Sequence, residues 1–378
     1  MSSEVDSIIV VTMAEDCGQL TIRNIQVEEV ESWLDFVSSM FAFKGVLRDH
    51  FAKHYHNDPW RNSDTIFVAQ DQPEASQRSC EEMYSSTLRI FQRRIYSQAD
   101  QLRCGGVGEV CTRPDRRKQG LCRKLLTYAE GQTDFQLLSL HTSSMSAVYR
   151  SCGFQSVPLA FKNVTVRAKR YIDFHGILDE AELEGVSQDL VGAVPLFYRV
   201  TPADLQDEAT VKLLMRMHEE FHRGRFDGPI VRDQVEYWQR WMPCNMRDSG
   251  FLLQRSRSKE EDGQEVRGFL SLGYDKWKDL FFLADFFVGS EELTSDGGCH
   301  ALLTLIAHAL AEQGVEEATV RIPASVAATM PQLSRGDGAC KVVEGEADLG
   351  TMYRAKDGCC LDVLLQESRH LTWPVDSF

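Results

Sequence analysis

The chain has 378 residues, of which 43% are hydrophobic and 26% are charged, and its formal net charge at pH 7 is −15. This length and composition are typical of a globular protein with room for two domains. The acidic balance argues against nucleic acid as a partner, because counterion release needs a broad basic surface. It suits a cationic substrate such as a primary amine.

Neither a targeting segment nor a membrane span is expected from the sequence. The apolar run over residues 8–11 follows two acidic residues and is too short for the hydrophobic region of a signal peptide. No apolar run approaches the length of a membrane span. The eleven cysteines are scattered and form no Cys-x-x-Cys motif, so we expect reduced thiols in a cytoplasmic protein.

The first half of the chain has strand and helix patterns in a regular order. Residues 20–25 show the alternation of a strand, and residues 27–41 carry apolar side chains at helical spacing, among them Trp33 and Val37. Further elements expected here are a helix over 45–55, a strand over 65–69, a loop over 71–82, strands over 87–96 and 102–112, a helix from 121, a strand over 135–140, a helix over 144–152 and a strand over 164–166. The resulting order is β-α-α-β-β-β-α-β-α-β.

A basic turn joins the strand that ends at Thr112 to the helix that follows Gly120. Pro114 cannot donate to a central ladder, so the strand ends before it. Gly120 lets the backbone approach a ligand closely. Free N–H groups, the positive end of the helix dipole and basic side chains converge in this turn, which predicts a site for a phosphate or pyrophosphate. The cations are Arg113, Arg116, Arg117 and Lys118.

The segment Arg117-Lys118-Gln119-Gly120-Leu121-Cys122 resembles the Arg/Gln-x-x-Gly-x-Gly/Ala signature of the GNAT superfamily of acetyl-CoA-dependent N-acetyltransferases, with Cys122 where Gly or Ala is usual. Residues 147–154 are similar to the family's Tyr-x-x-x-Gly-Phe helix and turn. The element order and the separation of the two motifs also match. The resemblance covers residues 20–167 and implies an α+β fold with a mixed, mostly antiparallel sheet flanked by helices.

The same resemblance implies acetyl-CoA as the cosubstrate. In that family the loop holds the CoA pyrophosphate, and the preceding strand hydrogen-bonds the pantetheine arm through its backbone, here at Val110 and Thr112. The cofactor-binding residues that it implies are Val110, Cys111, Thr112, Arg117, Lys118, Gln119, Gly120, Leu121 and Cys122.

The second half repeats this order without a basic turn. The expected elements are helices over 205–222 and 231–241, strands over 250–253, 266–274 and 280–288, an apolar helix over 302–311 and a strand over 318–322. Thr294 and Ser295 stand where the family pattern has Arg or Gln, so a pyrophosphate is poorly held there. We expect a cofactor-binding GNAT domain over 1–167, a linker over 168–198, and a degenerate GNAT-like domain over 199–378 whose C-terminal tail reaches toward the active site.

Two tandem GNAT-like units resemble the Eis-like (enhanced intracellular survival) acetyltransferases and, comparably, tandem fungal lysine N-acetyltransferases. Residues 114–121 are similar to the phosphate-loop pattern of the Eis-like enzymes. Those enzymes usually carry a third, sterol-carrier-like domain, for which too few residues follow the second unit. The acceptor therefore stays open between a lysine-like molecule, a polyamine, an aminoglycoside and a peptide lysine, and so does the oligomeric state.

Amine acetylation needs a base that leaves the amine neutral, donors for the oxyanion and an acid for the departing thiolate. The resemblance places Tyr149 beside the CoA sulfur, as the acid. For the base it implies Glu109, since some GNAT enzymes use a Glu on this strand, or the terminal carboxylate of Phe378, as in Eis-like enzymes. Asp376 is a further candidate. His141, just past its strand, either relays a proton or is hydrogen-bonded at the strand end.

A rival motif, His218-Glu219-Glu220-Phe221-His222, matches His-Glu-x-x-His, which on a helix directs two imidazoles toward zinc. No further histidine follows nearby as a third ligand, so we expect no metal. The leading hypothesis is an N-acetyltransferase that moves acetyl from acetyl-CoA to a primary amine by direct transfer in a ternary complex. The alternative is a non-catalytic CoA-binding protein with a regulatory or scaffold role.

Overall fold

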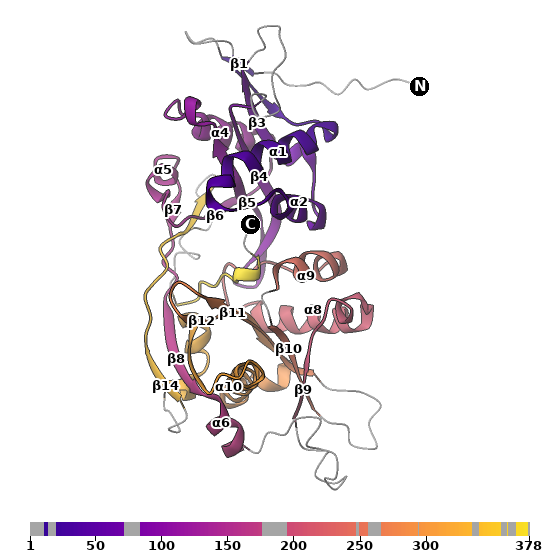
Figure 1. Cartoon of the computed structure of the whole chain (residues 1–378), viewed down its shortest axis with the longest axis vertical. Helices are drawn as coiled ribbons and strands as arrows, with labels where there is room; N and C mark the ends of the chain where they lie inside the picture. The colour runs from indigo at the N-terminus through magenta and orange to yellow at the C-terminus, as the bar shows by residue number, and fades with distance from the viewer. Residues whose placement is uncertain are drawn as a thin grey trace.

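The computed structural model describes residues 11–13, 20–71, 84–175, 195–246, 249–255, 266–293, 295–334, 340–356, 361 and 368–376. These residues form two mixed, mostly antiparallel sheets flanked by helices, which confirms the α+β class with two units. The two units follow one another along the long axis of the molecule (Figure 1). Among the described residues, no helix combines the length and the apolar character that a membrane span requires.

The first sheet has the strand order β1-β2-β3-β4-β5-β6-β15-β7, with β5 and β6 parallel. Helices α1 and α2 cover one face and α4 covers the other. The strands are β1 (Val11–Met13), β2 (Leu20–Asn24), β3 (Ile66–Asp71), β4 (Ser86–Ser97), β5 (Asp100–Thr112), β6 (Leu137–His141), β7 (Gln155–Ser156) and β15 (Thr351–Ala355). The helices are α1 (Val30–Phe41), α2 (Arg48–Asn57), α4 (Leu121–Gln132) and α5 (Ser146–Ser151).

The second sheet has the order β14-β8-β13-β12-β11-β10-β9, with β12 and β13 parallel. Helix α10 packs on β10, β11 and β12, and α8 packs on β12. The strands are β8 (Phe161–Arg167), β9 (Pro195–Arg199), β10 (Ser249–Arg255), β11 (Val266–Asp275), β12 (Leu280–Val288), β13 (Glu317–Pro323) and β14 (Cys340–Glu344). The helices are α6 (Ala168–His175), α8 (Glu208–His222), α9 (Met242–Asn245), α10 (Ser295–Glu312) and α11 (Ala324–Ala328).

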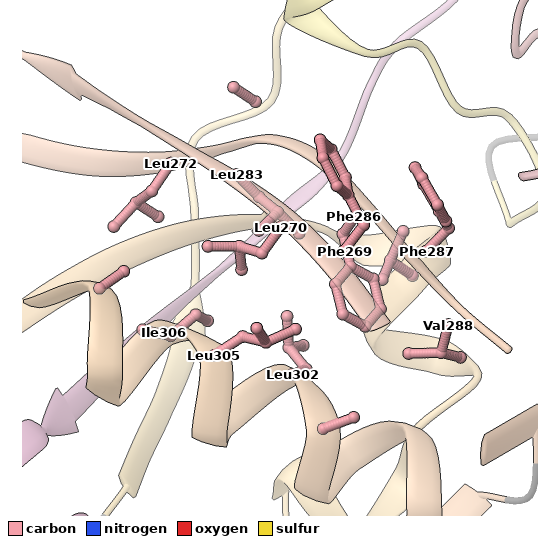
Figure 2. Packing of buried hydrophobic residues seen from close by; sticks show 14 of the residues in the cluster. Phe269, Leu270, Leu272, Leu283, Phe286, Phe287, Val288, Leu302, Leu305 and Ile306 are labelled. Atoms are coloured by element: carbon pink, nitrogen blue, oxygen red, sulfur yellow. The ribbon is translucent and has the colours of Figure 1, made fainter. Parts of the chain in front are cut away.

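Helix α10 is the centre of the second unit's core. All of residues 301–310 are buried, as expected for a helix without a polar face. Figure 2 shows Leu302, Leu305 and Ile306 of α10 beneath Phe269 and Leu270 of β11. The apolar run predicted from the sequence therefore fixes the position of this helix under the sheet.

Two predicted elements differ from the structure. The predicted linker over 168–198 contains α6 and the start of β9; α6 forms because Tyr171 is buried and its hydroxyl lies 3.1 Å from Nδ1 of His300. The predicted helix over 231–241 begins later, at residue 235, and passes through a π-helical turn, η7 (Tyr237–Trp241), directly into α9. The carbonyl of Arg232 accepts from the indole of Trp238 at 3.0 Å, in place of a helical backbone bond. The domain boundaries themselves stay a prediction.

The two halves of the chain exchange strands. Strand β8, predicted to close the first unit, pairs with β13 and β14 in the second sheet. Strand β15, from the end of the chain, pairs with β6 and β7 in the first sheet (Figure 1). The prediction for residues 164–166 is therefore right about the strand and wrong about its unit, because alternation marks a strand but not its partner.

Candidate functional site

Strands β5 and β6 separate in the middle of the first sheet. Their parallel pairing runs from Cys104 to Gly106 and from Leu137 to Ser139. Beyond this point β5 continues to Thr112 with β4 as its neighbour. The β5 edge that faces β6 is not hydrogen-bonded to another described strand there, so its backbone groups can bind an extended ligand.

A β-bulge at Glu109 sets the register of this edge. Thr87 lies opposite Cys111, and Arg89 lies opposite Gly108, so β5 holds one residue more than β4. Glu109 has a φ of 53°, in the left-handed region that a bulge can require. Val110 packs against the core on the α4 side, whereas Glu109 faces Arg89. The expected alternation of Glu109 and Val110 is therefore preserved.

The Glu109 carboxylate is enclosed and forms an ion pair with Arg89, but no described residue lies within hydrogen-bond range of it. Its side chain is 4% exposed, and its Oε1 lies 3.7 Å from Nη1 of Arg89, beyond hydrogen-bond range. Neither oxygen has a hydrogen-bond partner among the described residues. Burial raises the pKa of Glu109 to about 7, with Arg89 opposing the shift and Asp58 adding to it. The carboxyl group is therefore poised to exchange a proton near neutral pH.

Two buried arginines beside Glu109 are residues that the sequence analysis missed. Asp58, just after α2, accepts from Nη2 of Arg89 at 2.8 Å and from Nη1 of Arg93 at 3.0 Å. The guanidinium of Arg93 also lies 4.9 Å from the ring centre of Trp241, in the second unit. Cations at i and i+4 lie on the same face of a strand, and this spacing of Arg89 and Arg93 was the available signal.

The basic loop after β5 divides its cations into two pairs. Arg113 and Arg116 both contact Asp71 of β3, and Arg113 also pairs with Asp115 at 2.7 Å. These two charges are balanced within the loop and its neighbouring strand. They hold the loop against β3 and do not belong to the free anion site that the sequence predicts.

Arg117 and Lys118 are exposed, and the ion pairs of the described residues include neither of them. Gly120, with a φ of 72°, is the N-cap of α4 and provides no side-chain bond to its first N–H groups. Two cations and open helix donors thus remain for an anion.

The other predicted cofactor residues have separate environments. Cys111 packs against the α1 side, and the Thr112 hydroxyl forms a hydrogen bond with that of Ser86. The Gln119 amide donates to the Asp115 carbonyl, Leu121 is buried, and Cys122 is half-buried in the first turn of α4.

Tyr149 on α5 lies close to the first turn of α4. Its ring centre is 5.8 Å from that of Phe154, in an edge-on contact. Burial raises the pKa of Tyr149, and the nearby thiols of Cys122 and Cys152 add to the shift. The hydroxyl therefore keeps its proton at neutral pH and can act as a donor. Gly153, with a φ of 87°, follows the C-cap Cys152 of α5.

The candidate bases at the chain end fare differently. Phe378 lies outside the described residues. Asp376 is buried, and its carboxylate accepts from Nε and Nη2 of Arg232 at 3.0 and 2.8 Å and from the Tyr237 hydroxyl at 2.7 Å. Arg232 also pairs with Asp285 at 2.6 Å. Three donors already occupy this carboxylate, so the geometry argues against Asp376 as the base.

The His-Glu-x-x-His motif fastens the chain end instead of presenting two free imidazoles. Nδ1 of His222 lies 2.7 Å from the carbonyl of His218, and Nε2 accepts from the indole of Trp373 at 2.8 Å. Both ring nitrogens of His222 are thus engaged. Within the described part of the chain, no three His, Cys, Asp or Glu side chains are grouped as metal ligands would be.

A cavity of about 290 Å³ lies between the two sheets, next to the point where β5 and β6 separate. Cys104 and Ser139 line it from the first sheet, and Phe282 and Leu283 line it from the second. The residues 372–374 and Asp376 also line it. Its walls are mostly apolar, which suits a small organic ligand. Its charged or titratable lining consists of Arg93, Cys104, His141, Arg321, Asp348, Tyr353 and Asp376.

The second unit has a similar separation of parallel strands, since β12 and β13 pair only at Phe281–Phe282 and Val320–Arg321. Its β12 also carries a register shift, beside Asp285, and the Asp285 carboxylate is held by Arg232. At the start of α10, a Cβ on Gly298 would lie 3.1 Å from the carbonyl of Glu292, so η8 (Ser290–Leu293) packs closely there. The expected asymmetry between the units stays a prediction.

The geometry of the first unit agrees with its sequence family. Residues 21–157 match the family profile described as the acetyltransferase (GNAT) domain. The chain contains a GNAT acyltransferase domain. No curated protein matches the chain in sequence.

Solved structures extend the likeness of fold to the second unit. A GCN5-related N-acetyltransferase from Anabaena variabilis is 12% identical, with a TM-score of 0.55 over 89% of this chain and 72% of that one. A probable N-acyltransferase from Enterococcus faecalis is 13% identical, with a TM-score of 0.57 over 92% and 75%. Eis1 from Mycobacterium abscessus is 14% identical, with a TM-score of 0.53 over 89% and 73%. The chain therefore shares a tandem GNAT fold with these proteins.

Proposed function

We propose that this protein is an N-acetyltransferase that moves acetyl from acetyl-CoA to a primary amine by direct transfer in a ternary complex. The observation that carries the proposal is the separation of β5 from β6, with a cationic helix start at one end and a cavity beside it. The pyrophosphate would bind Arg117, Lys118 and the N–H groups after Gly120, and the pantetheine arm would bind the β5 backbone at Val110 and Thr112.

Glu109 is the base in this proposal, and Tyr149 is the acid. The pKa of Glu109 is raised to about 7, which lets the carboxylate accept a proton near neutral pH. Tyr149 keeps its proton and can donate it to the departing thiolate. Oxyanion donors would come from the unpaired β5 edge. The terminal carboxylate of Phe378 stays a second candidate for the base, because it lies outside the described residues.

The cavity between the sheets is proposed as the acceptor site. Its apolar walls favour an amine on a carbon chain or ring, and the net charge of −15 favours a cationic substrate. A lysine-like molecule, a polyamine, an aminoglycoside and a peptide lysine are the acceptor classes to compare.

Thiol release from acetyl-CoA with these four classes of amine tests the proposal, together with calorimetry of CoA binding. Arg117→Glu should weaken CoA binding about 10- to 100-fold, because one charged hydrogen bond to phosphate is lost and a repulsion is added. Lys212→Glu is the matched control, since Lys212 is an exposed cation on α8. It should bind CoA as the wild type does.

The outcomes separate the two hypotheses from the sequence. CoA binding with turnover of at least one amine supports the enzyme. CoA binding that is lost in Arg117→Glu, without turnover of any amine, supports the non-catalytic CoA-binding protein. Equal CoA affinity in Arg117→Glu and the wild type would contradict the proposed phosphate site.

A further inference from the structure

The end of β6 carries an imidazole and a carboxylate that come from different halves of the chain. Nε2 of His141 lies 2.9 Å from Oδ2 of Asp348. Both residues line the cavity between the sheets. The His141 side chain is 52% exposed, so it stands at the boundary between the cavity and water. Among the described residues no hydrogen bond to Nδ1 of His141 is formed, which leaves this nitrogen open to a ligand or water.

The position of Asp348 is fixed on both sides. Its backbone N–H donates to the carbonyl of Leu159 at 2.9 Å, and its Oδ1 accepts from the N–H of Gly350 at 2.8 Å. A Cβ on Gly350 would lie 2.6 Å from the carbonyl of Thr142 and 2.8 Å from Nε2 of His141. A glycine is therefore needed for β15 to approach β6 closely enough to bring this carboxylate to the imidazole.

Stoichiometry calls for a second proton acceptor beside Glu109. When an ammonium becomes an amide, a C–N bond forms, the C–S bond of the thioester breaks, and the nitrogen loses two protons. One proton ends on the CoA sulfur and the other must leave for water. Neither Glu109 oxygen is exposed to water, whereas His141 is half-exposed. The two groups also lie on different strands, β5 and β6, on either side of the strand separation.

We propose that His141 takes the first proton from the bound ammonium through Nδ1 and passes it to water, and that Asp348 is the positioning residue that orients the imidazole. This inference rests on the proposed acetyltransfer. Asp348 donates no proton; it holds the tautomer with hydrogen on Nε2, which leaves the Nδ1 lone pair free. The hydrogen bond to Asp348 raises the pKa of His141, and burial opposes the shift.

Other charged groups that line the cavity have partners of their own. Arg93 is bound by Asp58, Asp376 is bound by Arg232, and the guanidinium of Arg321 stacks on Phe161 at 3.8 Å and donates to the Glu346 carbonyl. Asp348 is therefore the charged group that makes direct contact with His141. Replacement of its charge should lower the pKa of His141.

The test is the pH dependence and chemical rescue of acetyltransfer in the full chain, with an amine that the wild type uses. His141→Ala should lower kcat/KM at neutral pH about 10- to 100-fold. Added imidazole should restore part of the activity of His141→Ala, because the vacated site is open to water. It should not restore the activity of Glu109→Gln. Reactions without the amine correct for acetylation of imidazole itself. Asp348→Asn should lower the pKa of His141, followed by NMR of its imidazole protons, and should lower the plateau of the kcat/KM profile.

The results distinguish this inference from the proposed function. If none of the amines causes the wild type to release CoA, both the proposed function and this inference are contradicted. If the wild type is active but His141→Ala keeps the wild-type kcat/KM, the role of His141 is overturned. The same holds if added imidazole restores no activity to His141→Ala. An unchanged pKa of His141 in Asp348→Asn overturns the pairing, and this measurement holds even where His141→Ala fails to fold.

Discussion

Glu109 combines two features that oppose each other at the scale of one residue. The bulge directs its carboxyl group into an enclosed space, and no donor there forms a hydrogen bond with it. Ionisation of an enclosed acid costs free energy, which appears as the raised pKa. The same cost makes the carboxylate a better proton acceptor. An isosteric amide at this position should therefore separate activity from stability.

Glu109→Gln should lower kcat for acetyltransfer by a factor on the order of 10² to 10⁴, because the amide cannot accept the proton. The KM for acetyl-CoA should change little, since Glu109 lies on the α2 side of the sheet, away from the basic loop. Steady-state kinetics with saturating amine measure both constants. If Glu109→Gln kept wild-type kcat while removal of residues 377 and 378 abolished it, the base would belong to the chain end.

The same variant should be more stable than the wild type at alkaline pH. The folded pKa of Glu109 is raised from 4.5 to about 7, so the stability that its protonated form contributes is present below pH 4.5 and lost as pH rises through 7. Glutamine does not titrate, so at pH 8 Glu109→Gln should gain on the order of 3 kcal/mol relative to the wild type. Urea unfolding at pH 4 and pH 8 measures the stability difference between Glu109→Gln and the wild type. An equal stability difference at the two pH values would contradict the raised pKa of Glu109.

At the scale of elements, the segment from residue 368 to 376 is fastened to the second unit by three side chains of that unit, His222, Asp227 and Arg232. His222 receives the Trp373 indole, and Asp227 pairs with Arg369 at 3.0 Å. Arg232 binds Asp376 in full burial. One histidine of the metal-like motif, His222, and one candidate base, Asp376, thus hold the segment 368–376 beside the cavity.

Asp376→Asn should destabilise the protein by roughly 3 kcal/mol, because a buried guanidinium loses one of its two carboxylate partners. Asp233→Asn is the matched control. Asp233 pairs with Arg94 at 2.5 Å, but both side chains are about two-fifths exposed, at 44% and 38%. Its loss should cost less than about 1 kcal/mol. Urea unfolding measures the stability of both variants. A similar loss of stability in both would show that the Arg232–Asp376 pair does not hold the segment 368–376 in place.

The basic loop and the Tyr149 helix were predictable from the sequence because each motif is local, within a few residues of chain. The core helix α10 was predictable because its apolar run has no polar face. Asp348 was not predictable as a partner of His141, since it lies 207 positions away. The bulge at Glu109 was not predictable either, because it depends on how β4 and β5 are paired.

At the scale of the whole molecule, the exchange of β8 and β15 makes each sheet depend on both halves of the chain. Without β15, β7 would lose the strand with which it pairs, and the hydrogen-bonding edge of β6 would be exposed. Without the second unit, β8 would lose both of its neighbours. This dependence could not be predicted from the sequence, because the alternation of side chains indicates a strand but not the sheet to which the strand belongs.

The exchange predicts that residues 1–175 do not form a stable GNAT domain alone. The fragment would expose β8 and the edge of β6. It would also expose the apolar side chains of Ile95 and Leu137, which Tyr353 covers in the full chain. It should therefore aggregate or unfold without a cooperative transition. A full chain cleaved by an engineered protease site between residues 175 and 195 should instead elute as one complex and unfold in a single transition. Size-exclusion chromatography and urea unfolding measure both. A monomeric fragment 1–175 that unfolds cooperatively and binds CoA would show that the strand exchange is not required for the first unit to fold.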